Sequence, residues 1–322
     1  MTRILPSANE VREAYSRIGA HIIRTPLIPS PALTDAVGGE VYLKLENRQE
    51  GGSFKLRGAL NALLSLNDAE RAAGVVASSA GNHGIGVAIA AAKLGIRATI
   101  FVPASAPDIK REKIAALGAA VDASQPHYDA AEDAARAFAA EHGATFVSPC
   151  TGRALLAGAG TVALEIFESL PIARTVVVCV GGGGLVGGIG GFVQDAAAGV
   201  RILGAQSERT NAMSLALQRN GAVDVPDLPT LCDGLAGRVD AEMFAQGKAA
   251  LDGIATATED AVAAAIKFLH VAHGETVEGS GAVGVAALRE GALKPQAFPV
   301  AVTVSGANIP PSRWRDVVSG AD

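Results

Sequence analysis

Residues 175–193 constrain the fold of this chain more than any other stretch. They carry no charge over a length that could span a bilayer, but eight of them are glycine. Each glycine inside a helix costs about 1 kcal/mol relative to alanine, which argues against a single membrane helix. The β-branched run Thr175–Val180 instead predicts a strand buried on both faces of a parallel sheet. A glycine loop and a helix to about Ala197 follow it, so we expect a soluble protein.

Strand-like and helix-like segments alternate along the rest of the chain. Further strands are predicted at Val41–Leu45, Val75–Ser78, Arg97–Val102, near Val121, Thr145–Val147, Ile202–Gln206 and Val300–Val304. Helices are predicted at Ala8–Ile23, Leu56–Leu66, His83–Leu94, Asp108–Leu117, Tyr128–Glu141, Thr151–Glu168, Glu259–His273 and Ser280–Arg289. Repeated strand–helix units imply parallel sheets with helices on their faces. We expect two α/β lobes, with the functional site in the cleft between them.

Composition narrows the partners and the compartment. The chain is 49% hydrophobic but 4% aromatic, so its core must be built from Ala, Val, Leu and Ile. A net charge of −5 without a basic cluster makes nucleic acid and anionic membranes poor partners. Met1–Glu10 has no apolar segment typical of a signal peptide. The three cysteines, Cys150, Cys179 and Cys232, form no disulfide framework, and a reducing cytoplasm fits them best.

Lys55 lies in an unusual place, directly after a Gly51-Gly52 turn and at the start of an apolar helical run. Ser53 is a suitable N-cap for that helix. The positive end of a helix dipole disfavours an ammonium and lowers its pKa. A free lysine amine is the nucleophile of Schiff-base chemistry, although a lone lysine at a helix start is more often a surface residue.

The glycine run that follows the Thr175–Val180 strand is a candidate phosphate site. Its exposed backbone N–H groups at a helix start can surround a phosphate. Gly182, Gly184 and Gly187 satisfy G-x-G-x-x-G, but Gln206 stands where a dinucleotide site needs an acid. Phosphate binding without a second nucleotide is favoured. Close packing of the strand on the helix is the alternative.

Two further loops follow predicted strands. The segment Ser78–Gly84 offers small hydroxyls and amides at a helix start, which suit a carboxylate, and Asn82 can add a directional hydrogen bond. The segment Ser305–Asn308 lies at the carboxyl end of the last strand, where open α/β sheets bind ligands. Read alone, each loop is equally well an ordinary turn.

Together, the motifs Ser53–Ala59, Ser79–His83, Gly181–Gly184 and Ser305–Asn308 resemble one family, the fold-type II pyridoxal-phosphate (PLP) enzymes. The similarity is to the threonine/serine dehydratase and serine racemase group and runs from about Arg24 to Asn308. It implies two open parallel-sheet lobes of the tryptophan synthase β type, with the cofactor between them. Residues 1–66 and 150–322 would form the large cofactor-binding domain and residues 67–149 a small, mobile domain. A cytoplasmic homodimer is usual in the group.

The resemblance also implies roles for individual residues. Lys55 would be the catalytic residue: it would hold PLP as a Schiff base and then remove the α-proton of the substrate. The remaining cofactor contacts would come from Phe54, Asn82, Gly181, Gly182, Gly183, Gly184, Leu185 and Ser305, with Asn82 at the ring hydroxyl and Ser305 at the pyridine nitrogen. The substrate would be bound by Ser79, Ala80, Gly81 and His83.

Departures from the family pattern refine the activity. Racemases of the group carry a serine where this chain has Ala80, which has no proton to deliver to the far face of the cofactor. A dehydratase acting on L-threonine or L-serine, releasing a 2-oxo acid and ammonia, is therefore favoured. Metal-binding relatives carry glutamate at the position of Gln206, so no metal ligand is assigned and a divalent cation stays open, with Glu208 nearby.

Several alternatives remain at this stage. The same chemistry on 3-hydroxyaspartate, phenylserine or a diamino acid from compatible-solute breakdown is the nearest one. Serine racemisation follows, and a non-catalytic cofactor-binding protein represents a different class.

Overall fold

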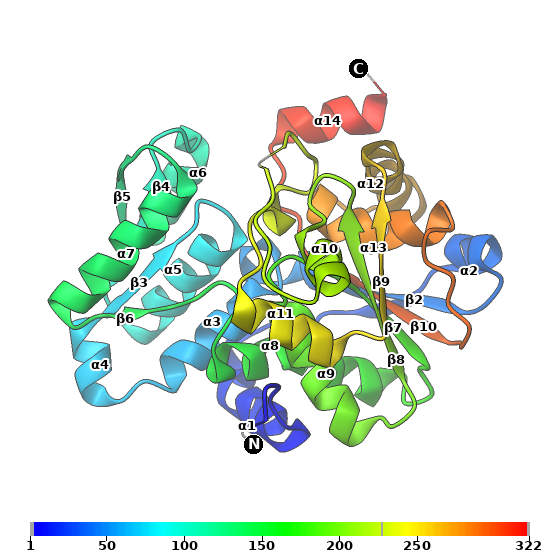
Figure 1. Ribbon diagram of the computed structural model, residues 1–322, viewed down its shortest axis with the longest axis horizontal. Coiled ribbons are helices and arrows are strands. Elements are labelled where there is room, and N and C mark those ends of the chain that lie inside the picture. The colour runs from blue at the N-terminus through cyan, green and yellow to red at the C-terminus, as the bar shows by residue number, and fades with distance from the viewer. Residues whose placement is uncertain (1–2, 227, 321–322) are drawn as a thin grey trace.

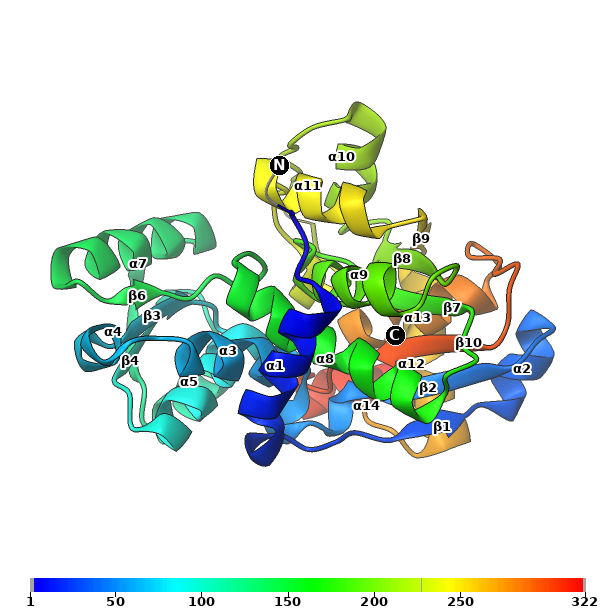
Figure 2. The same ribbon diagram turned by 90° about the horizontal axis from the view of Figure 1, so that it is seen from below.

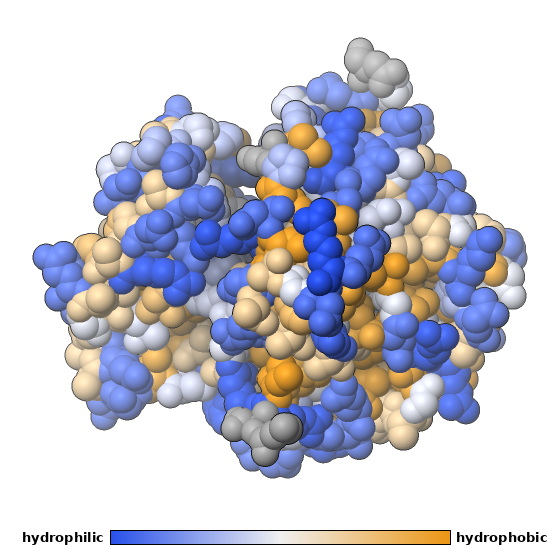
Figure 3. Space-filling model, viewed as in Figure 1, coloured by the Kyte–Doolittle hydropathy of each residue, from blue (hydrophilic) through white to orange (hydrophobic). Residues whose placement is uncertain are grey.

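A computed structural model describes residues 3–226 and 228–320 of the chain. The chain forms two lobes, each built around its own sheet (Figure 1). The chain enters the large lobe first, passes through the small lobe and then returns to the large lobe. On the face shown in Figure 3 a notch separates the two lobes, and polar side chains cover most of the surface.

The large lobe contains a six-stranded sheet with the order β1-β2-β10-β7-β8-β9. Its strands are β1 (Leu27–Pro29), β2 (Val41–Leu45), β7 (Thr175–Cys179), β8 (Arg201–Ser207), β9 (Gly253–Ala257) and β10 (Val300–Val304). All neighbours are parallel except β1, which pairs antiparallel with β2 at the edge. Every residue of β7 and β10 is buried, as the uncharged β-branched runs predicted.

The small lobe contains a four-stranded parallel sheet with the order β5-β4-β3-β6. Its strands are β3 (Val75–Ser78), β4 (Ala98–Pro103), β5 (Ala120–Gln125) and β6 (Thr145–Phe146). The helices that accompany them are α4 (Asp68–Ala73), α5 (Asn82–Leu94), α6 (Asp108–Ala116) and α7 (Tyr128–His142). The carboxyl end of β3 leads into the Ser79–Asn82 loop, which therefore faces the large lobe.

Among the described residues, ten α-helices of the large lobe cover its sheet and the boundary with the small lobe. They are α1 (Ala8–Ile18), α2 (Pro31–Val37), α3 (Lys55–Leu64), α8 (Arg153–Ser169), α9 (Gly184–Ala196), α10 (Ala212–Arg219), α11 (Ala241–Ala250), α12 (Glu259–His273), α13 (Gly279–Arg289) and α14 (Pro311–Ser319). Figure 2 shows α1 crossing α8 at the boundary between the lobes, beside α3.

The apolar helices α8 and α9 approach each other closely. A side chain on Gly188 of α9 would place its Cβ 2.3 Å from the carbonyl oxygen of Leu156 on α8. The same glycine faces Gly160, also on α8, so the helix backbones are nearly in contact. This packing explains why α9 tolerates so many glycines, whose cost in a free helix would be high.

Most predicted elements are confirmed to within two or three residues. The first helix ends at Ile18 and continues as a single 3-10 turn, Gly19–His21, rather than running to Ile23. Short elements with weak periodicity were not predicted: β1, β9, α2, α4, α10, α11 and α14. Residues 175–193 divide into β7 and α9, and no helix among the described residues is long and apolar enough to cross a membrane.

Candidate active site

Several helices begin at the cleft without a side chain capping their first turn. Within the described parts of the chain, the first-turn N–H groups of α3, α5, α9 and α13 donate to no capping side chain. Other helices are capped, since Ser7, His127, Asp240 and Thr258 cap α1, α7, α11 and α12, although α2, α6 and α14 are uncapped as well. Open helix N-termini are suited to anions. The cleft therefore presents several positive backbone ends to one region.

Lys55 is the first residue of α3, as the sequence predicted. Its Nζ donates a hydrogen bond to the carbonyl oxygen of Pro149 at 2.7 Å, and the ring of Phe54 lies 5.3 Å away. Burial lowers the pKa of the Lys55 amine below its usual value. The amine is thus held by a neutral carbonyl and is easier to deprotonate than a surface lysine.

The prediction that Ser53 caps α3 is wrong. Ser53 is extended and forms an isolated antiparallel bridge with Gly306, while the N-cap position is taken by Phe54. The backbone N–H of Phe54 donates to the carbonyl oxygen of Ser305 at 3.2 Å. These contacts join the start of α3 to the carboxyl end of β10, and so bring Lys55 and Ser305 into one site.

The glycine loop packs directly on the segment that holds Lys55. A Cβ on Gly182 would lie 2.5 Å from Cys150 Sγ, and one on Gly184 would lie 2.9 Å from Cys150 Cα. Gly183 has a φ of 90°, which favours glycine. Cys150 follows Pro149, the residue that accepts the hydrogen bond from Lys55. The glycine loop therefore packs on Cys150, and Lys55 is hydrogen-bonded to the residue directly before it, Pro149.

Asn82 lies at the centre of a polar network that links both lobes. Its Nδ2 donates to Glu278 Oε1 at 2.6 Å, and its Oδ1 accepts from Asn308 Nδ2 at 2.6 Å. Asn308 also donates to the carbonyl oxygen of Gly51 at 2.7 Å and accepts from Lys113 Nζ at 2.6 Å. Asn82 and Asn308 belong to predicted motifs, whereas the part played by Lys113 had no sequence signal.

Glu278 is a functional candidate to which the sequence assigned no role. Burial, together with the charge of Asp233, raises its pKa to about 7. It is the N-cap residue of α13, and its carboxylate accepts the hydrogen bond from Asn82. A carboxyl group that titrates near neutrality within a cleft is typical of functional sites.

The four predicted substrate residues occupy two different environments. Ser79, Ala80 and Gly81 are partly exposed, and Ser79 Oγ accepts a hydrogen bond from the amide of Gly81 at 3.1 Å. His83 is buried, and its Nε2 lies 2.8 Å from the carbonyl oxygen of Val147. Burial and the charge of Lys55 lower the pKa of His83 to about 3. Its imidazole is therefore neutral and set beneath the loop.

Ser305 lies where β10 ends, next to the start of α13. Its hydroxyl lies 3.4 Å from the carbonyl oxygen of Ser280 and also contacts the Cys179 thiol. The neighbouring hydroxyl, Ser280 Oγ, is buried and has no partner among the residues that the structure describes. Burial raises the pKa of the adjacent Cys179 thiol to about 11. Neutral groups that can donate and accept therefore surround Ser305.

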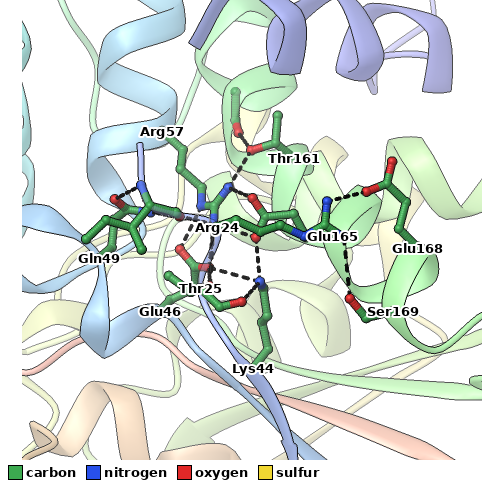
Figure 4. Close-up of polar contacts among 12 residues, drawn as sticks. Arg24, Thr25, Lys44, Glu46, Gln49, Arg57, Thr161, Glu165, Glu168 and Ser169 are labelled. Atoms are coloured by element: carbon green, nitrogen blue, oxygen red, sulfur yellow. Dashed lines mark hydrogen bonds and ion pairs between the residues drawn. The ribbon is translucent and has the colours of Figure 1, made fainter. Parts of the chain in front are cut away.

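A buried ionic cluster, formed by Lys44, Glu46, Arg57 and Glu165, anchors the helix that carries Lys55 (Figure 4). The Arg57 guanidinium contacts both carboxylates at 2.7–2.9 Å. Lys44 completes the cluster by contacting Glu165, so two cations balance two carboxylates. The cluster ties the first turn of α3 to β2 and α8. Sequence analysis missed it, because the pattern of charges in the chain does not reveal which ones are buried.

The residues at this site fit pyridoxal phosphate. The uncapped start of α9 and the Gly181–Gly184 amides suit its phosphate, and the Lys55 amine suits its aldehyde. The neutral Ser305 hydroxyl can meet a ring nitrogen without carrying a full charge. For a metal ion the outcome differs: within residues 3–226 and 228–320 no group of three or more His, Cys, Asp or Glu side chains could hold one.

Comparison with known proteins agrees with this geometry. Residues 18–306 match the family described as "pyridoxal-phosphate dependent enzyme". The chain belongs to this family, and its cofactor is accordingly pyridoxal 5′-phosphate.

The related proteins include threonine ammonia-lyases or dehydratases and a serine racemase. The chain is 41% identical over 93% of its length to an L-threonine ammonia-lyase from Thermotoga maritima, covering 75% of that protein. It is 37% identical to a putative threonine dehydratase from Sinorhizobium fredii, covering 98% of this chain and 96% of the relative. Among solved structures, maize serine racemase has a TM-score of 0.92 at 28% identity and 98% coverage of both chains. A processed threonine deaminase from Solanum lycopersicum has a TM-score of 0.89 at 30% identity, covering 99% of this chain and 96% of the other.

Proposed function

We propose that the protein is an ammonia-lyase that dehydrates and deaminates a small β-hydroxy amino acid, L-threonine or L-serine, to a 2-oxo acid and ammonia. The observation that carries the proposal is the Lys55 amine, whose pKa burial lowers and which donates to Pro149, the residue before the Cys150 on which the Gly181–Gly184 loop packs. A side chain that could give a proton from the other side is missing at Ala80. The 34–41% identity to threonine ammonia-lyases and dehydratases supports the same substrate class.

We assign the binding roles as follows. The amides of Gly181 to Gly184 and of Leu185 bind the phosphate, Asn82 binds the ring hydroxyl, and Ser305 faces the ring nitrogen. Phe54 lies beside the lysine and limits the space on that side. The amides and hydroxyl of the Ser79–Gly81 segment bind the substrate carboxylate at the open end of α5. His83 supports that loop from below through its contact with Val147.

When bound, the cofactor withdraws electrons from the α-carbon of the substrate and so weakens its C–H bond. Lys55 is placed to take that proton, because burial keeps its amine easily deprotonated. Elimination needs this proton removal and the loss of hydroxide from the β-carbon. Delivery of a proton to the far face is not needed, which is consistent with Ala80. A neutral Ser305 leaves the ring a moderate electron sink, which favours prompt elimination.

The test is release of 2-oxo acid from a panel of L- and D-β-hydroxy amino acids, with and without magnesium. We expect rapid release from L-threonine or L-serine, independent of magnesium, and loss of both turnover and yellow colour in Lys55→Ala. Activity that survives in Lys55→Ala would refute the assignment. Turnover restricted to 3-hydroxyaspartate, phenylserine or a diamino acid would keep the chemistry and change the substrate.

The second candidate is serine racemisation, which the structural similarity to serine racemases favours. It predicts α-proton exchange with solvent and formation of D-serine. Ala80→Ser is the informative variant, since it adds the hydroxyl that the far face lacks. Racemisation that exceeds elimination in the unaltered enzyme would reverse the order of the two proposals.

We also propose that the enzyme is a cytoplasmic homodimer with a catabolic role. Its large domain would comprise residues 1–66 and 150–322, and residues 67–149 would form a mobile small domain. Sedimentation equilibrium tests the dimer. Hydrogen exchange with and without substrate tests the mobility of the small domain. If that domain closes on the substrate, the Ser79–Asn82 loop should become protected from exchange on binding.

A further inference from the structure

Gln206 is a buried carboxamide directly behind the glycine loop. It lies near the end of β8 and is fully buried. Its Nε2 donates a hydrogen bond to the carbonyl oxygen of Val180 at 2.9 Å. Its Oε1 accepts a hydrogen bond from the amide of Ser214 at 2.9 Å. Both ends of the amide are therefore used, each by a backbone group.

The first contact acts on the peptide that opens the loop. Val180 joins β7 to Gly181, and its own N–H is bonded to Ala205 on β8 at 3.0 Å. A trans peptide is planar, so the Gly181 N–H points opposite to the Val180 carbonyl. By holding that carbonyl, Gln206 fixes the direction of the first amide of the loop. That amide consequently points away from Gln206.

The second contact acts on the helix behind the loop. Ser214 lies in the first turn of α10, whose amides have no partner within the helix. Its neighbour Met213 packs on the loop, with Cε 3.5 Å from the position that a Cβ on Gly183 would occupy. Gln206 thus connects the peptide that opens the loop to the helix that supports its centre.

We propose that Gln206 is a positioning residue for the phosphate of the cofactor, acting through the Gly181–Gly184 loop. The inference rests on the proposed cofactor site. The chemistry requires an amide: an ionised carboxylate could accept from Ser214, but it would have no proton to donate to Val180. A methionine of similar length would leave both backbone groups buried without partners, which is costly.

The test compares cofactor-free Gln206→Met and Gln206→Glu with the unaltered protein. Equilibrium affinity is measured for pyridoxal phosphate and for pyridoxal, which lacks the phosphate. We expect both variants to lose about tenfold in affinity for pyridoxal phosphate near pH 8, equivalent to about 1.4 kcal/mol. Affinity for pyridoxal should stay within about twofold, because the loop meets only the phosphate. Amide hydrogen exchange of residues 181–184 should also accelerate in the cofactor-free variants.

Gln49→Met is the matched control. Gln49 is also buried, and its amide likewise bridges two backbone groups, the N–H and the carbonyl of Ile23, at 2.9 and 2.8 Å. It should lower stability without changing the ratio of the two affinities. Equal losses for both ligands in the Gln206 variants, or no loss at all, would overturn the inference. An unaltered protein that binds neither ligand would instead reject the proposed function, and loop exchange would still report on Gln206.

Discussion

The buried ionic cluster gives a prediction with a calculable size. Arg57→Met removes four hydrogen bonds to two carboxylates, all at 2.7–2.9 Å, from side chains that are fully buried. One cation, Lys44, then faces both Glu46 and Glu165, so the site carries a net charge of −1. Breaking a buried ion pair from one side costs about 3–5 kcal/mol, because a desolvated charge remains. We expect a loss of that size in the free energy of unfolding at pH 7.

The same reasoning predicts a recovery. Arg57→Met combined with Glu46→Gln leaves Lys44 with Glu165 and restores neutrality. The double variant should therefore cost at least about 2 kcal/mol less than the sum of the two single variants. In the unaltered protein, burial opposes ionisation of Glu46, but Arg57 outweighs it and the pKa is lowered. Without Arg57 burial dominates and the carboxylate can take a proton, so the penalty of Arg57→Met should shrink at pH 5.

The assay is urea unfolding of the cofactor-free protein at both pH values, followed by circular dichroism. Arg24→Met is the control, because Arg24 pairs with Glu168 at the surface with about half of both side chains exposed, and such pairs contribute about 0–1 kcal/mol. A loss in the free energy of unfolding for Arg57→Met no larger than that for Arg24→Met would contradict the prediction. So would a double variant whose loss equals the sum of the losses in Arg57→Met and Glu46→Gln.

Three further predictions follow from individual contacts. Glu278 has a folded pKa of about 7 against 4.5 in the unfolded chain, so the stability linked to it is fully present below pH 4.5 and is lost as the pH rises through 7. As the pH rises from 4.5 to 7, the free energy of unfolding of Glu278→Gln, measured by urea titration, should rise by about 3 kcal/mol relative to that of the unaltered protein. A difference between the two proteins that does not change with pH would refute this linkage. Gly188→Ala brings a methyl group 2.3 Å from the Leu156 carbonyl oxygen and should destabilise by about 1–3 kcal/mol or more; an unchanged melting temperature would contradict the close contact of α8 and α9. Lys113→Ala removes the 2.6 Å contact with Asn308 between the lobes. It should speed hydrogen exchange in α6 while lowering the free energy of unfolding by less than about 1 kcal/mol. Unchanged exchange would show that this contact does not hold the small lobe.

The sequence predicted the elements whose burial is extreme. Both buried strands, Thr175–Cys179 and Val300–Val304, consist of apolar and β-branched residues without charge, and burial on both faces produces that pattern. Short peripheral helices such as Asp68–Ala73 carry too few turns for periodicity to stand out.

Within the site, the features that depend on neighbouring residues in the sequence were predicted, whereas those that depend on contacts between distant segments were not. The position of Lys55 at a helix start follows from Gly51-Gly52 and the apolar run after it. Its low pKa was expected from the helix dipole, but burial is the cause that the structure gives, and the carbonyl that holds the amine belongs to Pro149, which is remote in sequence. The failed Ser53 cap has the same origin, because the bridge to Gly306 holds Ser53 in the tertiary structure. No local pattern reports contacts between such distant segments.

The order of strands in the large sheet has a consequence for biosynthesis. β10 lies at the centre, between β2 and β7, although it is made after all the other strands of the described residues. Until Val300–Val304 leaves the ribosome, β2 and β7 lack the strand that pairs with both of them, so each has an exposed edge. The small lobe, whose four strands lie together between residues 75 and 146, can close its sheet much earlier. A nascent chain stalled before residue 300 should therefore carry a folded small lobe beside an open large one, which is the form that a chaperone would meet.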